Sequence, residues 1–249
     1  MKAVEVNLAS IREAAASIQD EIHHTPLFLS RTFSELSGNM VYLKAENLQK
    51  TGSFKLRGAL NKVRHLTAAE KRRGVIAISA GNHAQGVALA ATRAGIPSTI
   101  VMPENAPIAK VMATKGYGAH VELFGKFFDE CAIKAKELQA ETGAILIHPF
   151  DDPYVIAGQG TIGLEIMAAL PEAEVVLVPV GGGGLIAGTA IGLKELKPSI
   201  GVIGVEAEGA ASMQASLQKG KVTTLESVKT LADGIAVKTP GRLTYEIAK

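Results

Sequence analysis

The sequence predicts an α/β fold in which parallel strands alternate with helices. Short apolar runs at 75–78, 98–102 and 174–180 have the length and composition of buried strands. A segment of helical length and pattern follows each of these runs. Such alternation favours parallel sheets, because the crossover helices between successive strands cover both faces. A second domain would be inserted into the first, because the chain shows no internal repeat and no low-complexity linker.

The individual elements are expected in a regular order. Apolar residues at helical spacing predict a first helix from Leu8 to Ile22, which ends before Thr25-Pro26 because a residue that precedes proline avoids helical geometry. Thr67 and Glu70 have the spacing of a capping box, and Gly95 is placed to end a helix. Further helices are expected at 56–66, 85–94, 106–115, 127–141, 151–170, 185–196 and 245–247, and strands at 40–43, 75–78, 98–102, 120–123, 145–147, 174–180 and 200–205.

Composition excludes several classes of protein. The 249 residues suffice for one large domain or two small ones, and 47% hydrophobic with 20% charged residues is an ordinary soluble composition. A net charge of +2, with no basic block interleaved with aromatics, argues against nucleic acid. The single cysteine, Cys131, excludes a disulfide framework and is expected to be packed in a helix. With no signal peptide and no apolar run near 18 residues, we expect a cytoplasmic protein without a membrane span.

The stretch Thr51 to Leu60, TGSFKLRGAL, places one lysine between a glycine-containing turn and a helical pattern. Phe54 and Leu56 give Lys55 an apolar setting. Burial makes a lysine lose its proton readily, and a neutral amine attacks carbonyl groups to form Schiff bases. The alternative is that Lys55 is one of 26 Lys and Arg residues on a solvated helix face.

Two strand-to-helix junctions add candidate binding groups to the loop that holds Lys55. In parallel sheets, ligands gather at the carboxyl ends of strands, where helix N-termini offer free amides. The run Gly181-Gly182-Gly183-Gly184 follows a strand and precedes a helix, so its backbone can approach a phosphate closely. The other junction, from Ser79 to His83, carries polar side chains at the start of a helix.

The glycine run also satisfies a different pattern. Gly182-x-Gly184-x-x-Ala187 matches a dinucleotide-binding sequence, and Glu206 falls where an acidic ribose ligand would lie. An NAD-dependent oxidoreductase is therefore an alternative, although it leaves Lys55 and the polar residues at 79–83 without a role. A Walker A loop is excluded, since no Gly-Lys-Ser/Thr follows the glycines.

Four motifs in one order carry a resemblance that covers almost the entire chain. They are SFKLRGA around Lys55, SAGNHAQG at 79–86, PVGGGGLIAG at 179–188 and LADGIAVKTPG at 231–241. Together they resemble the pyridoxal-phosphate-dependent threonine dehydratases (threonine ammonia-lyases), of the tryptophan-synthase-β-like fold type, to which serine racemase is closely related. The resemblance implies two doubly wound parallel-sheet domains, with pyridoxal 5'-phosphate as the cofactor.

The resemblance also implies a role for each candidate residue. Lys55 would bond covalently to the cofactor aldehyde and, once displaced by substrate, take the Cα proton. The other implied cofactor contacts are Phe54 on the pyridine ring, Asn82 on its 3-hydroxyl, Gly181, Gly182, Gly183, Gly184 and Leu185 on the phosphate, and Gly234 on the opposite side of the ring. The implied receptors of the substrate carboxylate are Ser79, Asn82 and His83.

As activity, the resemblance implies conversion of L-threonine, and of L-serine, to a 2-oxo acid and ammonia by elimination. It assigns 51–149 to a small mobile domain and 1–50 with 150–249 to a large one, in a homodimer or homotetramer. Relatives continue past 245–247, so the chain is expected to be C-terminally truncated and its own activity doubtful. A non-catalytic ligand-binding fragment therefore stays open as an alternative.

Two positions depart from the related serine racemases. Those enzymes carry a serine two residues before the cofactor-binding asparagine, where this chain has Ala80, so chemistry on one face of Cα, meaning elimination, is favoured. Their cation site uses a glutamate, a carbonyl and an aspartate. Here Glu206 and Ala210 match, but Ser212 replaces the aspartate, so no metal is expected.

Overall fold

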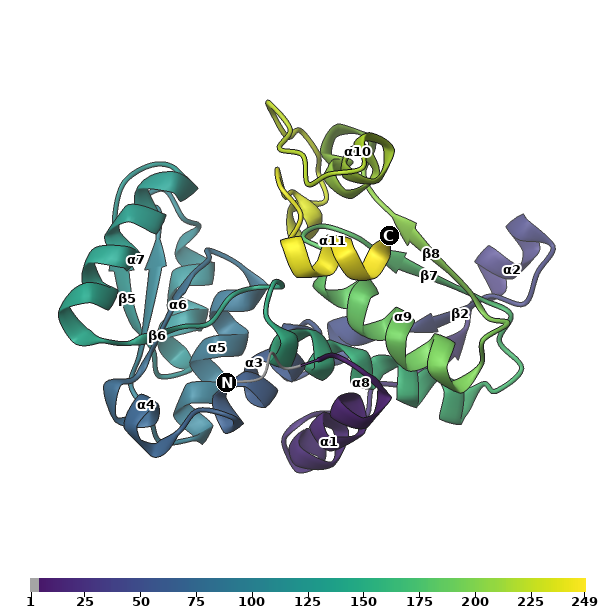
Figure 1. Ribbon diagram of the computed structural model, residues 1–249, viewed down its shortest axis with the longest axis horizontal. Helices are drawn as coiled ribbons and strands as arrows, with labels where there is room; N and C mark the ends of the chain where they lie inside the picture. The colour runs from purple at the N-terminus through teal and green to yellow at the C-terminus, as the bar shows by residue number, and fades with distance from the viewer. Residues whose placement is uncertain (1–4) are drawn as a thin grey trace.

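The structure is a computed structural model that describes residues 5–249, in which the chain forms two lobes side by side (Figure 1). Its α-helices are α1 (Leu8–Ile18), α2 (Arg31–Ser37), α3 (Lys55–Arg64), α4 (Ala68–Arg73), α5 (Asn82–Arg93), α6 (Ile108–Gly116), α7 (Phe128–Thr142), α8 (Pro153–Ala169), α9 (Gly184–Leu196), α10 (Ser212–Lys219) and α11 (Arg242–Ala248). Its strands are β1 (Leu27–Leu29), β2 (Tyr42–Lys44), β3 (Val75–Ile78), β4 (Ser98–Met102), β5 (His120–Leu123), β6 (Ile145–Leu146), β7 (Val175–Pro179) and β8 (Gly201–Val205). Short 3-10 turns are η1 (Gln19–Glu21), η2 (Glu46–Leu48), η3 (Glu208–Ala210) and η4 (Asp233–Ile235).

One lobe is built on a parallel sheet with the strand order β5-β4-β3-β6. Successive side chains of a strand point to opposite faces, so each strand contributes to two separate cores. Val75 and Ala77 pack in a cluster that includes residues of α3 and α5. Ile76 and Val101 pack on the other face, against Cys131 and neighbouring residues of α7. Helices therefore cover both faces of this sheet, as they do in doubly wound folds.

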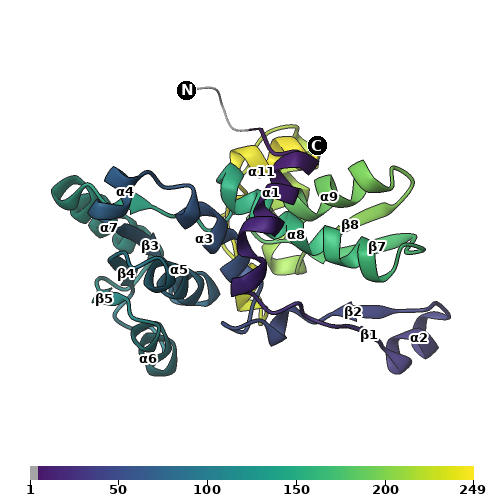
Figure 2. The same cartoon turned by 90° about the horizontal axis from the view of Figure 1, so that it is seen from below.

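The other lobe contains a parallel pair, β7 and β8, against which α8 and α9 lie. Val176 and Val202 pack against the buried side chains of these helices. On the opposite face the strands carry exposed apolar side chains: Val175, Leu177, Ile203 and Val205. The antiparallel pair β1–β2 and helix α2 extend along one side of this lobe (Figure 2).

Helix α3 joins the two lobes by crossing α8 at very short range. A methyl group at Gly158 would lie 2.6 Å from the carbonyl oxygen of Arg57 and 2.7 Å from the Cα of Gly58. Both neighbours are backbone atoms that no side-chain rotation can move. Only glycine fits at this crossing, and the first turn of α3, where Lys55 lies, is held firmly as a result.

Most of the expected elements are confirmed, with limits that differ by no more than three residues. The first helix, expected to reach Ile22, is an exception: α1 ends at Ile18 and the short turn η1 follows it. The strands at 75–78, 98–102 and 120–123 have the expected bounds, and Thr67 and Glu70 form the capping box. The strand expected at 40–43 starts at Tyr42 instead. The helices α2 and α10 and the antiparallel strand β1 were not expected. Among residues 5–249, none of the helices combines the length and the apolar character needed to cross a bilayer.

Candidate active site

Lys55 is the first residue of α3, and its amine reaches the segment that links β6 to α8. The amine Nζ donates a hydrogen bond of 2.7 Å to the carbonyl oxygen of Pro149 and lies 5.3 Å from the centre of the Phe54 ring. Burial lowers the pKa of the amine from 10.5 to about 8. At pH 7 about one amine in ten is then neutral, against about three in ten thousand at the ordinary value. The alternative of a solvated lysine is wrong.

The polar junction at 79–83 forms the N-terminus of α5 close to this amine. Asn82 is the first residue of α5 and is exposed, and Ser79 Oγ accepts a hydrogen bond of 3.1 Å from the Gly81 amide. The His83 ring is buried, and its Nε2 donates to the carbonyl oxygen of Ile147 at 2.8 Å. Burial, with the nearby charge of Lys55, lowers the pKa of His83 to about 3, so the ring is neutral. Because the His83 ring is occupied by its bond to Ile147, the donors that remain at this helix end are the backbone amides of the first turn.

The tetraglycine run forms the loop from β7 into α9. Gly183 has a φ of 93°, a left-handed conformation that glycine adopts without strain. The amides of Gly181, Gly182 and Gly183 donate no hydrogen bond to any part of the chain from residue 5 to 249. The carbonyl of Gly182 accepts from Thr244 Oγ1 at 2.6 Å and from the Gly241 amide at 3.1 Å. The loop is thus held by its carbonyl while its donors stay open, beside the positive end of α9.

Residues 147–151, which link β6 to α8, were not expected to belong to the site. Pro149 provides the acceptor for the Lys55 amine. A methyl group at Gly182 would overlap the ring of Phe150. Asp151 caps the N-terminus of α11, because its carboxylate accepts from the amide of Leu243 at 2.8 Å. Neither periodicity nor a known motif marks these residues, so their contribution follows from the fold alone.

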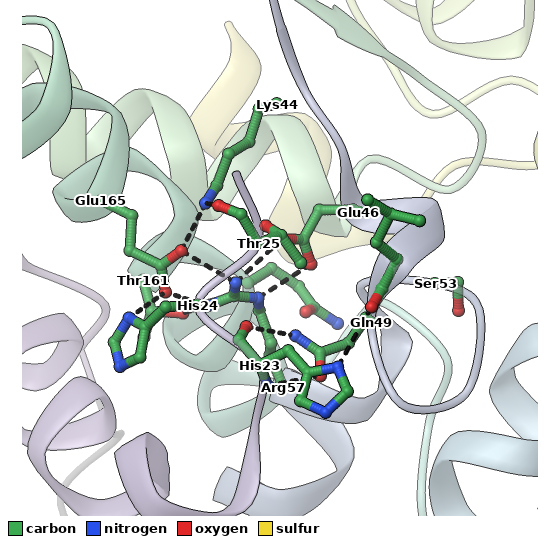
Figure 3. A network of polar contacts seen from close by, with 12 residues as sticks. His23, His24, Thr25, Lys44, Glu46, Gln49, Ser53, Arg57, Thr161 and Glu165 are labelled. Carbon is green, nitrogen blue, oxygen red and sulfur yellow. Dashed lines mark hydrogen bonds and ion pairs between the residues drawn. The ribbon is translucent and has the colours of Figure 1, made fainter. Parts of the chain in front are cut away.

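A buried ionic network fixes the far side of α3, as Figure 3 shows. The Arg57 guanidinium has no exposed surface and donates to Glu46 at 2.8 and 2.9 Å and to Glu165 at 3.0 Å. Burial alone would lower the pKa of Arg57, but the two carboxylates outweigh it and raise that pKa. Lys44 also donates to Glu165. The network joins the segment of β2 and η2 to α3 and α8.

The remaining candidates lie around the same junction. Leu185 is the second residue of α9. Ile235 of η4 lies close to Gly181, because a Cβ added at Gly181 would be 3.0 Å from the Cα of Ile235. Gly234 is exposed in η4. Its neighbour Asp233 forms an ion pair with Lys110 of α6, with 2.8 Å between Oδ2 and Nζ. This pair connects the two lobes.

Two positions singled out for their departures have structural surroundings of their own. Ala80 packs against the core beneath α5. The carboxylate of Glu206 accepts from the amides of Met213 and Gln214 at 2.9 and 2.8 Å, so it caps α10. Residues 5–249 contain no group of three or more His, Cys, Asp and Glu side chains arranged to hold a metal ion.

Residues 18–249 match the family of pyridoxal-phosphate dependent enzymes. The chain belongs to this family. It is 56% identical over 244 residues to an L-threonine ammonia-lyase of Thermotoga maritima, covering 98% of this chain and 61% of that protein. It is 54% identical over 245 residues to the catabolic L-threonine dehydratase TdcB of Staphylococcus aureus, covering 98% of this chain and 71% of that protein.

Solved structures of the family show the same tryptophan-synthase-β-like fold. Maize serine racemase superposes with a TM-score of 0.95 at 41% identity, over 98% of this chain and 74% of that one. The processed form of threonine deaminase isoform 2 from Solanum lycopersicum gives 0.92 at 44% identity, over 99% and 74%. The expected fold class is confirmed, and the oxidoreductase alternative is wrong.

The cofactor of this family is pyridoxal phosphate, and the residues present fit it. A phosphate needs N–H donors that have no other partner, and the amides of Gly181 to Gly183 meet this condition. An aldehyde needs an amine that can be neutral, and Lys55 meets this one. Both groups contact one short segment: the Lys55 amine donates to the carbonyl of Pro149, and Gly182 and Gly184 lie against Phe150.

Proposed function

We propose that this site removes the Cα proton and the β-hydroxyl of L-threonine and L-serine as water, and that hydrolysis of the released enamine then takes up water and gives 2-oxobutanoate or pyruvate with ammonia. The observation that carries the proposal is the Lys55 amine, with its pKa lowered to about 8, beside a glycine loop with open amides. The two relatives at 54–56% identity, a threonine ammonia-lyase and a threonine dehydratase, support the choice of substrate.

In this proposal the chain holds the cofactor at both ends. Lys55 would hold the aldehyde, and the amides of the glycine loop with Leu185 would hold the phosphate at the positive end of α9. Phe54 and Gly234 would contact the pyridine ring, and Asn82 would donate to the ring hydroxyl. When bound, pyridoxal phosphate supplies the electron sink that makes the substrate Cα–H acidic.

The N-terminus of α5 receives the substrate carboxylate. Ser79 and Asn82 offer polar side chains there, and the open amides of the first turn, that of His83 included, add the attraction of the helix dipole. The His83 ring takes part through its bond to Ile147, which holds the start of α5 in place.

Lys55 moves the proton. Its amine can accept the Cα proton only while it is neutral, and burial among apolar groups provides that state near neutral pH. A base with an ordinary lysine pKa would remain charged under the same conditions. The carbonyl of Pro149 accepts from Nζ, so it orients the amine within the site.

The proposal extends to the arrangement of the protein. Residues 51–149 form a small domain and residues 1–50 with 150–249 a large one, which close over the substrate and exclude water. The ion pair between Lys110 and Asp233 is the kind of contact that closure forms. The protein acts in the cytoplasm as a homodimer or homotetramer.

The test compares the wild type with Lys55→Ala. We expect the wild type to develop absorbance above about 400 nm when pyridoxal phosphate is added, and Lys55→Ala to lose this band together with threonine turnover. Lys126→Ala, at an exposed lysine in the loop before α7, is the matched control and should retain both. A Lys55→Ala protein that keeps band and turnover would refute the assignment.

Racemisation is a second candidate, because maize serine racemase superposes closely on this chain. Ala80 offers no group that could carry a proton on the second face of Cα. Ala80→Ser should therefore raise the ratio of D-serine formed to pyruvate formed from L-serine. Chiral analysis of the products measures this ratio, and an unchanged or smaller ratio would remove the role given to this position.

A further inference from the structure

Five consecutive residues, Ile147 to Asp151, contact Lys55, the start of α5 and the glycine loop. The carbonyl of Ile147 accepts from His83, and that of Pro149 accepts from the Lys55 amine. Phe150 packs against the glycine loop, where a Cβ at Gly184 would lie 2.9 Å from its Cα. Asp151 caps α11, whose Thr244 holds the carbonyl of Gly182. The shape of this one segment therefore sets the separation of the amine from the glycine loop.

The remaining residue of the segment, His148, holds that shape. Its Nδ1 accepts hydrogen bonds from the amide of Asp151 at 2.7 Å and from that of Phe150 at 3.3 Å. Its ring also meets the Phe150 ring edge-on, with 4.7 Å between the ring centres and an interplanar angle of 89°. A ring nitrogen accepts only when it carries no proton, so the proton of a neutral His148 lies on Nε2.

Among residues 5–249, these two amides have no acceptor besides His148. Pro149 has no N–H, so Phe150 and Asp151 supply the N–H groups of the turn, and both donate to His148 Nδ1. The neighbouring carboxylate of Asp152 instead accepts from the first amides of α8, those of Tyr154 and Val155. Loss of the His148 acceptor would leave two partly buried donors without partners, and such donors are costly.

We propose that His148 is a positioning residue, whose unprotonated Nδ1 fixes the turn that presents the Pro149 carbonyl to Lys55 and the Phe150 ring to the glycine loop. The inference rests on the proposed roles of Lys55 and of the glycine loop. It assigns His148 no contact with substrate or cofactor. Its effect is to keep a fixed distance between the Lys55 amine, which meets the aldehyde, and the glycine-loop amides, which meet the phosphate.

Charged groups around His148 determine when this acceptor is available. Burial lowers its pKa, the carboxylates of Asp151 and Asp152 oppose this, and the charge of Lys55 adds to the lowering. His83, on α5, is neutral. Since the folded pKa lies below the ordinary one, the unfolded state binds more protons as pH falls below about 6.5, and the turn loses stability in that direction.

The experiment uses two variants of nearly equal size. In His148→Asn the side-chain oxygen takes the place of Nδ1, whereas in His148→Gln it takes the place of Nε2. Three measurements are made: the tautomer of His148 by long-range ¹H–¹⁵N NMR of the wild type, hydrogen exchange at the amides of Phe150 and Asp151, and titration with pyridoxal phosphate followed by absorbance.

We expect the Nε2–H tautomer in the wild type and slow exchange of both amides. His148→Gln should speed this exchange and weaken cofactor binding, each about tenfold, while His148→Asn should remain within about threefold of the wild type. The Nδ1–H tautomer, a His148→Gln protein equal to the wild type, or a His148→Asn protein no better than His148→Gln would overturn the proposal. The NMR measurement needs no variant, so unfolding of either protein leaves the proposal testable.

The outcome also separates this inference from the proposed function. A wild type that fails to bind pyridoxal phosphate refutes the proposed function. The tautomer and exchange data then still test whether His148 holds the turn. A wild type that binds the cofactor while the amides of Phe150 and Asp151 exchange rapidly refutes only the inference about His148.

Discussion

The two parallel sheets of this chain differ in how completely their faces are covered. In the β5-β4-β3-β6 sheet, Ile76 is 1% exposed and Val101 is fully buried, and their neighbours on the other face are equally enclosed. In the β7–β8 pair, one face packs on α8 and α9, whereas on the other Leu177 is 65% and Ile203 51% exposed. Parallel sheets ordinarily bury both faces, so the second sheet has one face without a cover among residues 5–249.

This difference divides the candidate site. Lys55 and the start of α5 lie against the enclosed sheet, whereas the glycine loop follows β7 of the half-covered one. Local stability follows the density of buried apolar contacts. We therefore expect the amine half of the site to be more rigid than the half that receives the phosphate, with α3 and residues 147–151 as the connection.

The largest effect should come from breaking that connection. Arg57→Met removes the ion-pair partner of Glu46 and one of the two cations that pair with Glu165, which keeps Lys44, and this loss costs about 3–5 kcal/mol of unfolding free energy. Arg64→Met is the control in the same helix, because the pair of Arg64 with Glu21 is partly exposed and contributes about 1 kcal/mol or less. Urea denaturation measures both, and equal losses would contradict the structural role of the network.

The same variant has a pH dependence of known sign. Burial opposes ionisation of Glu165, but Arg57 and Lys44 hold its pKa below the ordinary value of 4.5. In the wild type this contribution to stability is therefore present above pH 4.5 and lost as pH falls through the folded pKa. In Arg57→Met the destabilisation should shrink on acidification, because a protonated Glu165 is buried at less cost. A constant difference across pH would argue against a charge effect.

A matched pair of truncations sharpens the contrast between the sheets. Ile76→Ala should cost about 2–5 kcal/mol, because the cavity opens in an enclosed core. Leu177→Ala should change the unfolding free energy by no more than about 0.5 kcal/mol, because that side chain already faces solvent. Thermal and urea denaturation of the two variants test this order. Equal losses would mean that the face of β7–β8 is covered in solution.

The ionisation of Lys55 tests the environment of the junction itself. Its folded pKa of about 8 lies below the ordinary 10.5, so the unfolded state binds more protons between these values and stability rises with pH in that window. Labelling of Lys55 by a small amine-reactive reagent, without cofactor, should reach half its maximal rate near pH 8. Exposed lysines such as Lys126 provide the internal reference. A midpoint for Lys55 close to 10.5 would mean that the amine is solvated.

The smallest effect concerns the bare face of β7–β8. Leu177→Lys should leave the unfolding free energy within about 0.5 kcal/mol of the wild type, because the change lies on solvent-exposed surface. It should reduce binding of a hydrophobic dye and self-association, since exposed apolar patches promote both. Fluorescence titration and sedimentation measure these properties. Unchanged dye binding would place the apolar surface elsewhere.

Regular elements could be predicted where a local pattern determines them. The strands β3, β4 and β5 are short segments that alternate with helices, and this alternation alone predicts their parallel pairing. The helix α2 has a serine cap at Ser30 and a left-handed Gly38 at its end, but Phe33 and Leu36 face solvent. Its apolar residues therefore form no buried stripe, and periodicity could not identify it.

The candidate site could be proposed from the sequence where chemistry is concentrated in short motifs. Lys55 and the glycine run stand out by residue type and by position at a junction, and the structure brings both to one place. Arg57 did not stand out, because its partners come from η2 and α8, which only the folded chain brings together. His148 acts through backbone amides, which leave no trace in the sequence.

The ion pair between Lys110 and Asp233 has a consequence for how the two lobes separate. Asp233 is 79% exposed, so the pair lies in water at the outer edge of the junction. Its strength depends on ionic strength, because the screening length falls from about 8 Å at 0.15 M salt to about 3 Å at 1 M. Concentrated salt should therefore release α6 from η4 without disturbing the enclosed network around Arg57, and the site would open from its rim inward.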